Sequence, residues 1–352
     1  MANARYVFLD GIRGVAALLV LTRHTDAFWN FEIYRGYLAV DLFFVLSGFV
    51  IASAYDRRLR DGQLTKGGFM LVRLIRLYPM YLLSLVLAML AWSLSAKPTP
   101  MLAGSLWVAS AMTAFFLPTP PHRDSILFPL NGPYWSLFFE LIANLGYAVC
   151  HRVLSNRMLV WILSFAALVL ARMAVRMGGL DDGYSFTAES LLIGLTRAVF
   201  GIAMGVLLFR TGARVSNWVE RLGSPWLAFL VVCGVMLSPD MGRLNVVVDL
   251  AAVCLLFPLA VLSMSRDSAT RFDRGLLALG AASYPMYVLH APVGELVQHL
   301  APTMIKAFAP YSGVAFVALF VPLAVWLERR IDVPLRRWLT NRLIGRTPLQ
   351  RA

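Results

Sequence analysis

The first long apolar stretch of the chain contains ionisable side chains, which are unfavourable in lipid and therefore indicate a function where they occur. Arg13 and His24 are eleven positions apart in this stretch. Because eleven helical steps of about 100° make about three full turns, both side chains project from one helix face, about 16 Å apart along its axis. A neutral imidazole there can take a proton from an attacking hydroxyl group, which is the role that acyl transfer to an alcohol requires.

Each of these side chains also has a structural interpretation. The His24 ring either acts as that base or is satisfied by a carbonyl of a neighbouring helix, and the nearby Asp26 favours the first alternative. Arg13 either orients the site of His24 or pairs with Asp10, one turn earlier. We retain His24 and Arg13 as candidate catalytic residues and Asp10 as a candidate substrate contact.

The second apolar stretch has one carboxylate near its start and a small polar pair further along. Asp41 either fixes His24 or a sugar hydroxyl, or is an interfacial acid favoured by the dipole of a helix N-terminus. Ser47 and Gly48 favour close helix packing over chemistry. Asp41 and Ser47 are kept as candidate substrate contacts.

Two arginines three residues apart, Arg73 and Arg76, open the third apolar stretch on one helix face. An arginine presents a planar fork of donors to anionic oxygens, so the pair suits phosphate recognition. The alternative is a positively charged anchor at the cytoplasmic end of a membrane helix. What the pair binds therefore decides the mechanism.

Two later stretches add a carboxylate, a histidine and aromatic rings. Ser136 and Glu140 lie one turn apart, and Glu140, placed in the outer half of the bilayer, must be paired, protonated or hydrogen-bonded to substrate. Trp135 is typical of an aromatic belt and can also stack on a sugar ring. Tyr287 and His290 share a face, and for His290 packing is the stronger alternative. Glu140 is a candidate catalytic residue, and the other four are candidate substrate contacts.

The elements that must position these residues are membrane helices. The 352 residues are 59% hydrophobic and only 14% charged, with a mean hydropathy of +0.69, which excludes a soluble globular protein. The 32 basic against 19 acidic residues give a formal charge of +13, but the basic residues cluster between apolar stretches. This pattern indicates contact with anionic lipid headgroups and excludes nucleic acid as the partner.

The bilayer core is about 30 Å thick, so a helix needs roughly 20 apolar residues to span it. We therefore predict an all-α polytopic membrane protein, a bundle of about ten transmembrane helices. The candidate spans are residues 7–28, 37–54, 70–94, 134–150, 158–177, 189–209, 225–238, 245–264, 276–298 and 312–328.

Charged loops predict the orientation of this bundle. Arginine-rich links follow every even-numbered span, whereas the opposite loops contain Glu32, Asp181, Asp182 and Asp240 with few basic residues. Both termini should therefore be cytoplasmic. A span at 101–117 would reverse every later loop, so this segment is expected to be a membrane-surface or re-entrant helix on the outer side.

Two further features narrow the class of protein. The three cysteines stand singly in apolar stretches, without the spacing of a metal site or redox motif. Asp10 and Arg13 interrupt the first apolar stretch, and no cleavage site ends it, so it is not a cleavable signal peptide. We expect no metal site.

Taken together, these motifs resemble the membrane acyltransferase-3 family, whose members O-acylate lipopolysaccharide O-antigens, exopolysaccharides, Nod factors and peptidoglycan. The resemblance covers essentially the whole chain, and its five motifs occur in the family's order. They are Leu9 to Gly14 with His24, the segment Val40 to Phe49, Arg73 and Arg76 with Tyr78 and Pro79, Trp135 to Leu137 with Glu140, and Ser283 to His290.

The resemblance implies that His24 is the essential catalytic residue and that Arg13 supports it. It also implies that Arg73 and Arg76, with Tyr78 beside them, hold the phosphate-bearing end of acyl-CoA at the cytoplasmic face. A long pantetheine arm then carries the thioester towards His24 near the outer side. The donor is acetyl-CoA by default, with no permanently bound cofactor, and the acceptor is a glycan or lipid-linked sugar. His24 acts either as general base or through a transient acyl-histidine.

Two departures from the family's pattern concern the acceptor contacts. Arg23 precedes His24 where many members have an uncharged residue, and Leu-Ile-Ala-Asn follows Glu140 in place of a second acid and aromatic residues.

The competing class is a membrane transporter or flippase of a glycan or acyl intermediate, in which the polar side chains line a translocation path. That class predicts inverted repeats and paired broken helices, which the sequence does not show. The prediction is therefore one integral-membrane O-acyltransferase domain over residues 1–352, with no appended soluble domain, in the inner membrane of a bacterial cell.

Overall fold

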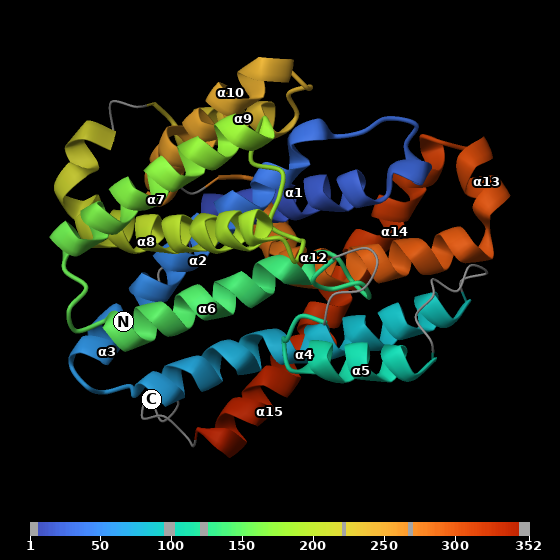
Figure 1. Ribbon diagram of the computed structural model, residues 1–352, viewed down its shortest axis with the longest axis horizontal. Helices are drawn as coiled ribbons and strands as arrows, with labels where there is room; N and C mark the ends of the chain where they lie inside the picture. Colours follow the sequence, from blue (N-terminus) through green and yellow to red (C-terminus); the bar gives the residue numbers. More distant parts are fainter. Residues whose placement is uncertain (1–5, 95–102, 120–125, 220–222, 267–269, 345–352) are drawn as a thin grey trace.

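The computed structural model describes residues 6–94, 103–119, 126–219, 223–266 and 270–344, without the side chains of residues 103–105 and 213–219. Helices account for all its regular elements, and the described residues form no strand beyond one isolated bridge between Ile126 and Ser185. The predicted all-α class is confirmed for this part of the chain. Most of the long helices run along the longest axis of the molecule (Figure 1).

Every predicted apolar stretch forms a helix. In chain order the elements are α1 (Val7–His24), η1 (Asp26–Phe28), η2 (Tyr34–Leu38), α2 (Ala39–Ile51), η3 (Ala52–Asp56), α3 (Arg57–Arg60), α4 (Lys66–Leu94), α5 (Ala103–Ala114), α6 (Tyr134–Cys150), α7 (Asn156–Met177), α8 (Ala188–Val219), α9 (Pro225–Met236), η5 (Gly242–Leu244), α10 (Asn245–Ala251), η6 (Ala252–Leu256), α11 (Phe257–Met264), α12 (Asp273–Leu300), α13 (Pro302–Ala307), α14 (Tyr311–Leu327), η7 (Glu328–Asp332) and α15 (Val333–Leu343).

Seven helices of the described chain are long and apolar enough to cross a membrane. They span Tyr34–Arg60, Lys66–Leu94, Asn156–Met177, Ala188–Gly212, Gly242–Met264, Asp273–Leu300 and Tyr311–Leu343. Helices α1, α6 and α9 form where spans were expected but are not among the seven. Helix α1 is 18 residues long and carries several charges, and α6 and α9 have only 17 and 12 residues. The count of ten spans and the cytoplasmic termini therefore stay predictions.

Two parallel helices, α1 and α12, carry five of the candidate residues, which are Asp10, Arg13, His24, Tyr287 and His290. A glycine allows their closest approach, because a Cβ added at Gly280 would lie 2.6 Å from the Asp10 Cβ. Further along, the rings of His24 and His290 are neighbours. The face that Arg13 and His24 were predicted to share is confirmed, since both side chains contact α12.

A second close pair, α2 and α8, depends on Gly48, where an added Cβ would collide with the Ile202 backbone. The packing role expected for this glycine is confirmed. The segment expected to be a surface or re-entrant helix, α5, lies alongside α4 instead of across the helix ends (Figure 1). The hydroxyl of Tyr81, midway along α4, donates to the Thr113 carbonyl at 2.6 Å. The choice between a membrane-surface and a re-entrant helix stays a prediction.

Candidate active site

The candidate side chains fall into two cavities that lie one above the other along α12. The first, the arginine cavity, has a volume of about 160 Å³ and apolar walls from α2, α4 and α6. Its polar lining consists of Arg13, Ser47, Arg73, Arg76, Ser136, Glu140, Ser283, Tyr284 and Tyr287. The second, the histidine cavity, has a volume of about 360 Å³. Its polar and aromatic lining consists of Arg23, His24, Glu32, Tyr37, Trp135, Asp181, Asp182, Tyr184, Arg197 and Tyr287.

Glu140 is paired with an arginine at the wall of the arginine cavity. Its Oε1 lies 2.5 Å from the Arg73 guanidinium and accepts a hydrogen bond of 2.5 Å from the Ser47 hydroxyl. Both ionic side chains are nearly buried, with 12% and 14% exposure. Glu140 was expected in the outer half of the bilayer, as was His24, but its carboxylate lies in the other cavity from His24, with the cation that neutralises it. Of the three alternatives for this carboxylate, the structure shows pairing.

The second arginine of the pair, Arg76, is more accessible than the first. It contacts Asp332 at 3.3 Å, and its guanidinium lies 5.0 Å from the Tyr284 ring centroid. Its side chain is 30% exposed, and Asp332 has a second partner in Arg336 at 2.9 Å. An anion that enters this cavity can therefore bind Arg76, because Asp332 still has its ion pair with Arg336.

Of the two roles expected for Arg13, the structure shows the pairing with Asp10. It forms an ion pair with Asp10 at 3.0 Å and donates hydrogen bonds of 2.8 Å to the Ser283 hydroxyl and the Gly280 carbonyl. These contacts join α1 to α12 and put the guanidinium at the arginine cavity, one level below His24. Asp10 lines neither cavity, since its carboxylate is held by Arg13.

His24 lines the histidine cavity. Its Nδ1 lies 2.9 Å from the carbonyl of Val20. Because a carbonyl only accepts, the neutral ring carries its proton on Nδ1 and leaves the Nε2 lone pair free. The ring is exposed to the cavity, and its centroid lies 5.0 Å from that of His290. His24 therefore has the tautomer that a general base needs.

His290 is fully buried behind His24 and lines neither cavity. Its Nδ1 lies 3.1 Å from the Met286 carbonyl, and its Nε2 has no hydrogen-bond partner among the residues that the structure describes. The structure thus places His290 against the candidate base, where it packs on the ring and does not reach the cavity in which substrate would lie.

Asp41 belongs to an ion pair that the sequence did not reveal. Its carboxylate receives two hydrogen bonds from Arg197, at 2.9 and 2.6 Å, and both side chains are 1% exposed. Arg197 also donates to the carbonyls of Tyr37 and Asp182 and lies over the Trp135 ring. The expected contact of Asp41 with His24 or a sugar is corrected, since a buried carboxylate needs a cation and Arg197 supplies it. The sequence contained one signal for this ion pair, because Arg197 is an ionisable residue inside the predicted span 189–209.

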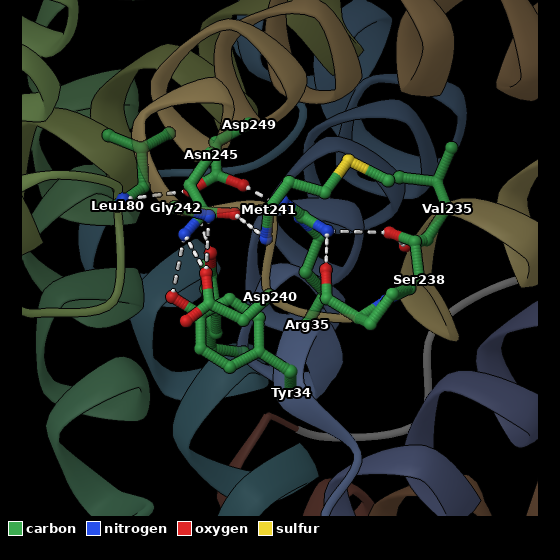
Figure 2. A network of polar contacts seen from close by, with 12 residues as sticks. Tyr34, Arg35, Leu180, Val235, Ser238, Asp240, Met241, Gly242, Asn245 and Asp249 are labelled. Carbon is green, nitrogen blue, oxygen red and sulfur yellow. Dashed lines mark hydrogen bonds and ion pairs between the residues drawn. The ribbon is translucent and has the colours of Figure 1, made fainter.

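A second buried network fixes η2, whose Arg35 lies among Ser238, Asn245 and Asp249 (Figure 2). Element η2 lines the histidine cavity at Tyr37. Arg35 is fully buried and donates to Asp249 at 3.3 Å and to Ser238 at 2.8 Å, and also to Asn245 and the Pro239 carbonyl. Asp249 in turn accepts from the Tyr37 hydroxyl at 2.7 Å and from the Leu180 backbone at 2.9 Å. Three distant segments of sequence therefore hold one wall of the cavity in place.

The same cavity contains a charged cluster around Arg23. This side chain lies 2.6 Å from Asp181 and 3.7 Å from Glu32, and it also donates to the Tyr34 carbonyl. Burial raises the pKa of the Asp181 carboxyl, and the Arg23 guanidinium opposes that rise. Arg23, the residue that departs from the family pattern, is thus part of the cavity wall beside His24.

The remaining candidates divide between the cavities and the fold. Trp135 lines the histidine cavity, Ser136 the arginine cavity, and Tyr287 both. Tyr78 lines neither, because it is two residues beyond Arg76 and so faces α5, where its hydroxyl donates to the Ala114 carbonyl at 3.0 Å. The expected role of Tyr78 in donor binding is corrected to one in helix packing.

The chain is similar to one protein family and to two known proteins. Residues 6–328 match the family described as an acyltransferase domain, Acyl_transf_3. The chain is 40% identical over 183 residues to "Protein 2 in picA locus" of Rhizobium radiobacter, which covers 47% of this chain and 93% of that protein. It is 28% identical over 157 residues to acyltransferase MdmB of Streptomyces mycarofaciens, covering 41% of this chain and 39% of MdmB. No solved structure matches the chain.

Proposed function

The chain belongs to the acyltransferase-3 family and is a membrane acyltransferase, and we propose that it moves an acyl group from coenzyme A to a hydroxyl group of a cell-surface glycan or glycolipid. The observation that carries this proposal is His24, whose Nδ1 contacts the Val20 carbonyl and whose exposed side chain lines a polar cavity directly beyond a cavity lined by arginines. The acyl group is acetyl by default, and the membrane is the inner membrane of a bacterium.

The arginine cavity suits the donor. Coenzyme A carries phosphate groups, and Arg76, with 30% exposure, can bind an anionic oxygen with its planar fork. The apolar walls from α2, α4 and α6 suit the uncharged pantetheine arm. Arg73 is held by Glu140 and Ser47, so its proposed role is to position the arm and not to take the phosphate.

The histidine cavity suits a sugar acceptor. Carboxylates, guanidinium groups and tyrosine hydroxyls provide both donors and acceptors for a ring bearing several hydroxyl groups. Trp135 adds an aromatic face, on which the apolar side of a sugar ring can stack. A bare lipid tail would leave these polar groups unpaired, which is unfavourable in a partly closed cavity.

The chemistry follows from the free nitrogen. His24 Nε2 takes the proton of the acceptor hydroxyl as its oxygen attacks the thioester carbonyl, and a new C–O bond forms. The C–S bond then breaks, and the coenzyme A sulfur leaves with the proton that His24 returns. The neutral base is regenerated, and neither oxidant nor metal takes part in this proposed step.

The experiment that tests this function follows label from radioactive acetyl-CoA into lipid-linked and polymeric glycan in membranes containing the protein. We expect alkali-labile label in the glycan fraction, since an O-acetyl ester is cleaved by base. Membranes without the protein give the background. If the glycan stays unlabelled with every acyl-CoA supplied, the donor assignment is wrong and a transporter becomes the better account.

A second result should locate the phosphate end of the donor. Arg76→Ala is expected to raise the KM for acetyl-CoA about 10- to 100-fold, the loss of one or two charge-assisted hydrogen bonds, with a smaller change in kcat. Asp332 keeps Arg336 in this variant, so the fold should survive. Arg57→Ala is the control, because this arginine is 85% exposed and its one ion pair within the described part of the chain is with Asp61. An unchanged KM in the Arg76 variant would place the phosphates elsewhere.

A further inference from the structure

Among the described residues, the two cavities share only two side chains, Val40 of α2 and Tyr287 of α12. Along α12, Ser283 marks the level of Arg13, and His290 marks the level of His24. With a rise of about 1.5 Å per residue, Tyr287 lies about 6 Å beyond Ser283 and about 4.5 Å before His290. It therefore stands at the boundary between the space proposed for the donor and the space that contains the candidate base.

The Tyr287 ring is held across this boundary from three sides. Its hydroxyl lies 2.6 Å from the Ser136 hydroxyl and donates to the Pro133 carbonyl at 3.2 Å. These two contacts hold α12 against the start of α6. Its ring meets Phe43 edge to face, with centroids 5.4 Å apart. The side chain is 6% exposed. A ring fixed in this way is a wall and not a mobile surface group.

We infer that Tyr287, together with Val40, which also lines both cavities, is the partition that limits the size of the acyl group delivered to His24. The inference rests on the proposed function. When the thioester carbonyl reaches His24 Nε2 from the arginine cavity, the acyl chain must occupy space next to this boundary. A two-carbon group needs little room there, whereas each further methylene meets the fixed ring. Tyr287 is thus a specificity-determining residue, and the Ser136 hydroxyl is its positioning partner.

The test compares transfer from acetyl-, butyryl- and hexanoyl-CoA by the wild type and by Tyr287→Ala. The butyryl to acetyl ratio of kcat/KM is expected to rise at least about tenfold in the variant, since even one methylene is worth that much in a tight apolar site. Val40→Ala, a milder enlargement of the same boundary, should shift the ratio in the same direction. Tyr311→Ala is the matched control, because this tyrosine is 76% exposed at the start of α14.

The outcomes separate the inference from the function on which it rests. A wild type that uses none of the three donors contradicts the proposed function itself. A wild type that transfers acetyl, together with variants that keep its chain-length ratio, contradicts only the partition. If Tyr287→Ala fails to accumulate in the membrane, Val40→Ala decides the question by the same ratio. A rise in KM alone, equal for all three donors, would show a packing role and would also overturn the inference.

Discussion

Replacing His24 by alanine is expected to abolish acyl transfer while the protein accumulates normally in the membrane. The side chain makes one hydrogen bond, to its own helix, and its ring is exposed to the histidine cavity, so its loss leaves the packing of α1 largely intact. Removal of a general base lowers a rate by about 10²- to 10⁴-fold. The measurement is the initial rate of label transfer from acetyl-CoA, divided by the amount of protein.

The control for this experiment is another histidine of the same bundle. His299 is exposed near the end of α12, where its Nδ1 lies 2.8 Å from the Glu295 carbonyl, the same type of backbone contact that His24 makes. His299→Ala should transfer at the rate of the wild type. Equal rates for His24→Ala and the wild type would make His24 a structural residue and would remove the base from the mechanism.

Loss of Arg197 is expected to destabilise the fold more than loss of any exposed arginine. Arg197→Ala leaves the Asp41 carboxylate buried without a partner, and breaking one member of a buried pair costs about 3–5 kcal/mol. Arg176 offers the matched comparison, since it pairs with Glu189 while 62% exposed. Such surface pairs are worth about 0–1 kcal/mol, so Arg176→Ala should behave as the wild type.

The measurement is thermal inactivation and monodispersity of the purified variants in one detergent. The double variant Asp41→Ala with Arg197→Ala should recover part of the loss, because it no longer buries an unpaired charge. If Arg197→Ala proves as stable as Arg176→Ala, the pair does not hold α2 to α8 in the way that the structure indicates.

Local pattern was sufficient to predict most of the fold. The apolar stretches predicted from length all form helices, since residues in lipid or in a helical core must satisfy their backbone within the helix. The shared face of Arg13 and His24 followed from helical periodicity alone, because α1 is one unbroken helix from Val7 to His24. Gly48 was also read correctly, as a site of close helix packing.

The pairing of charges could not be predicted, because it depends on which helices become neighbours. Glu140 and Arg73 are 67 positions apart, and Asp41 and Arg197 are 156 apart. The rule that ionisable residues inside spans have a function identified Glu140 and Asp41 but does not say which partner each will meet. The same rule, applied to the later spans, would have drawn attention to Arg197 and Asp249.

The sequence also did not predict the level in the helix bundle at which each side chain lies. Glu140 was placed in the outer half of the bilayer because it is near the start of its helix. Helix α6, however, begins beside the middle of α4, where the Tyr134 hydroxyl lies 2.6 Å from the Ser84 hydroxyl. One and a half turns later, α6 has reached the level of Arg73. Span boundaries drawn from hydropathy give no such offset between neighbouring helices.

We propose that the donor reaches this site from the cytoplasmic face of the membrane and the acceptor from the opposite face. Sealed inside-out vesicles, supplied on the outside with radioactive acetyl-CoA that cannot cross the bilayer, test it most directly. Our account predicts label on glycan inside the vesicles, protected from an added esterase until detergent is present and absent with His24→Ala. Label that the esterase removes without detergent would place donor and acceptor on the same face and contradict the account.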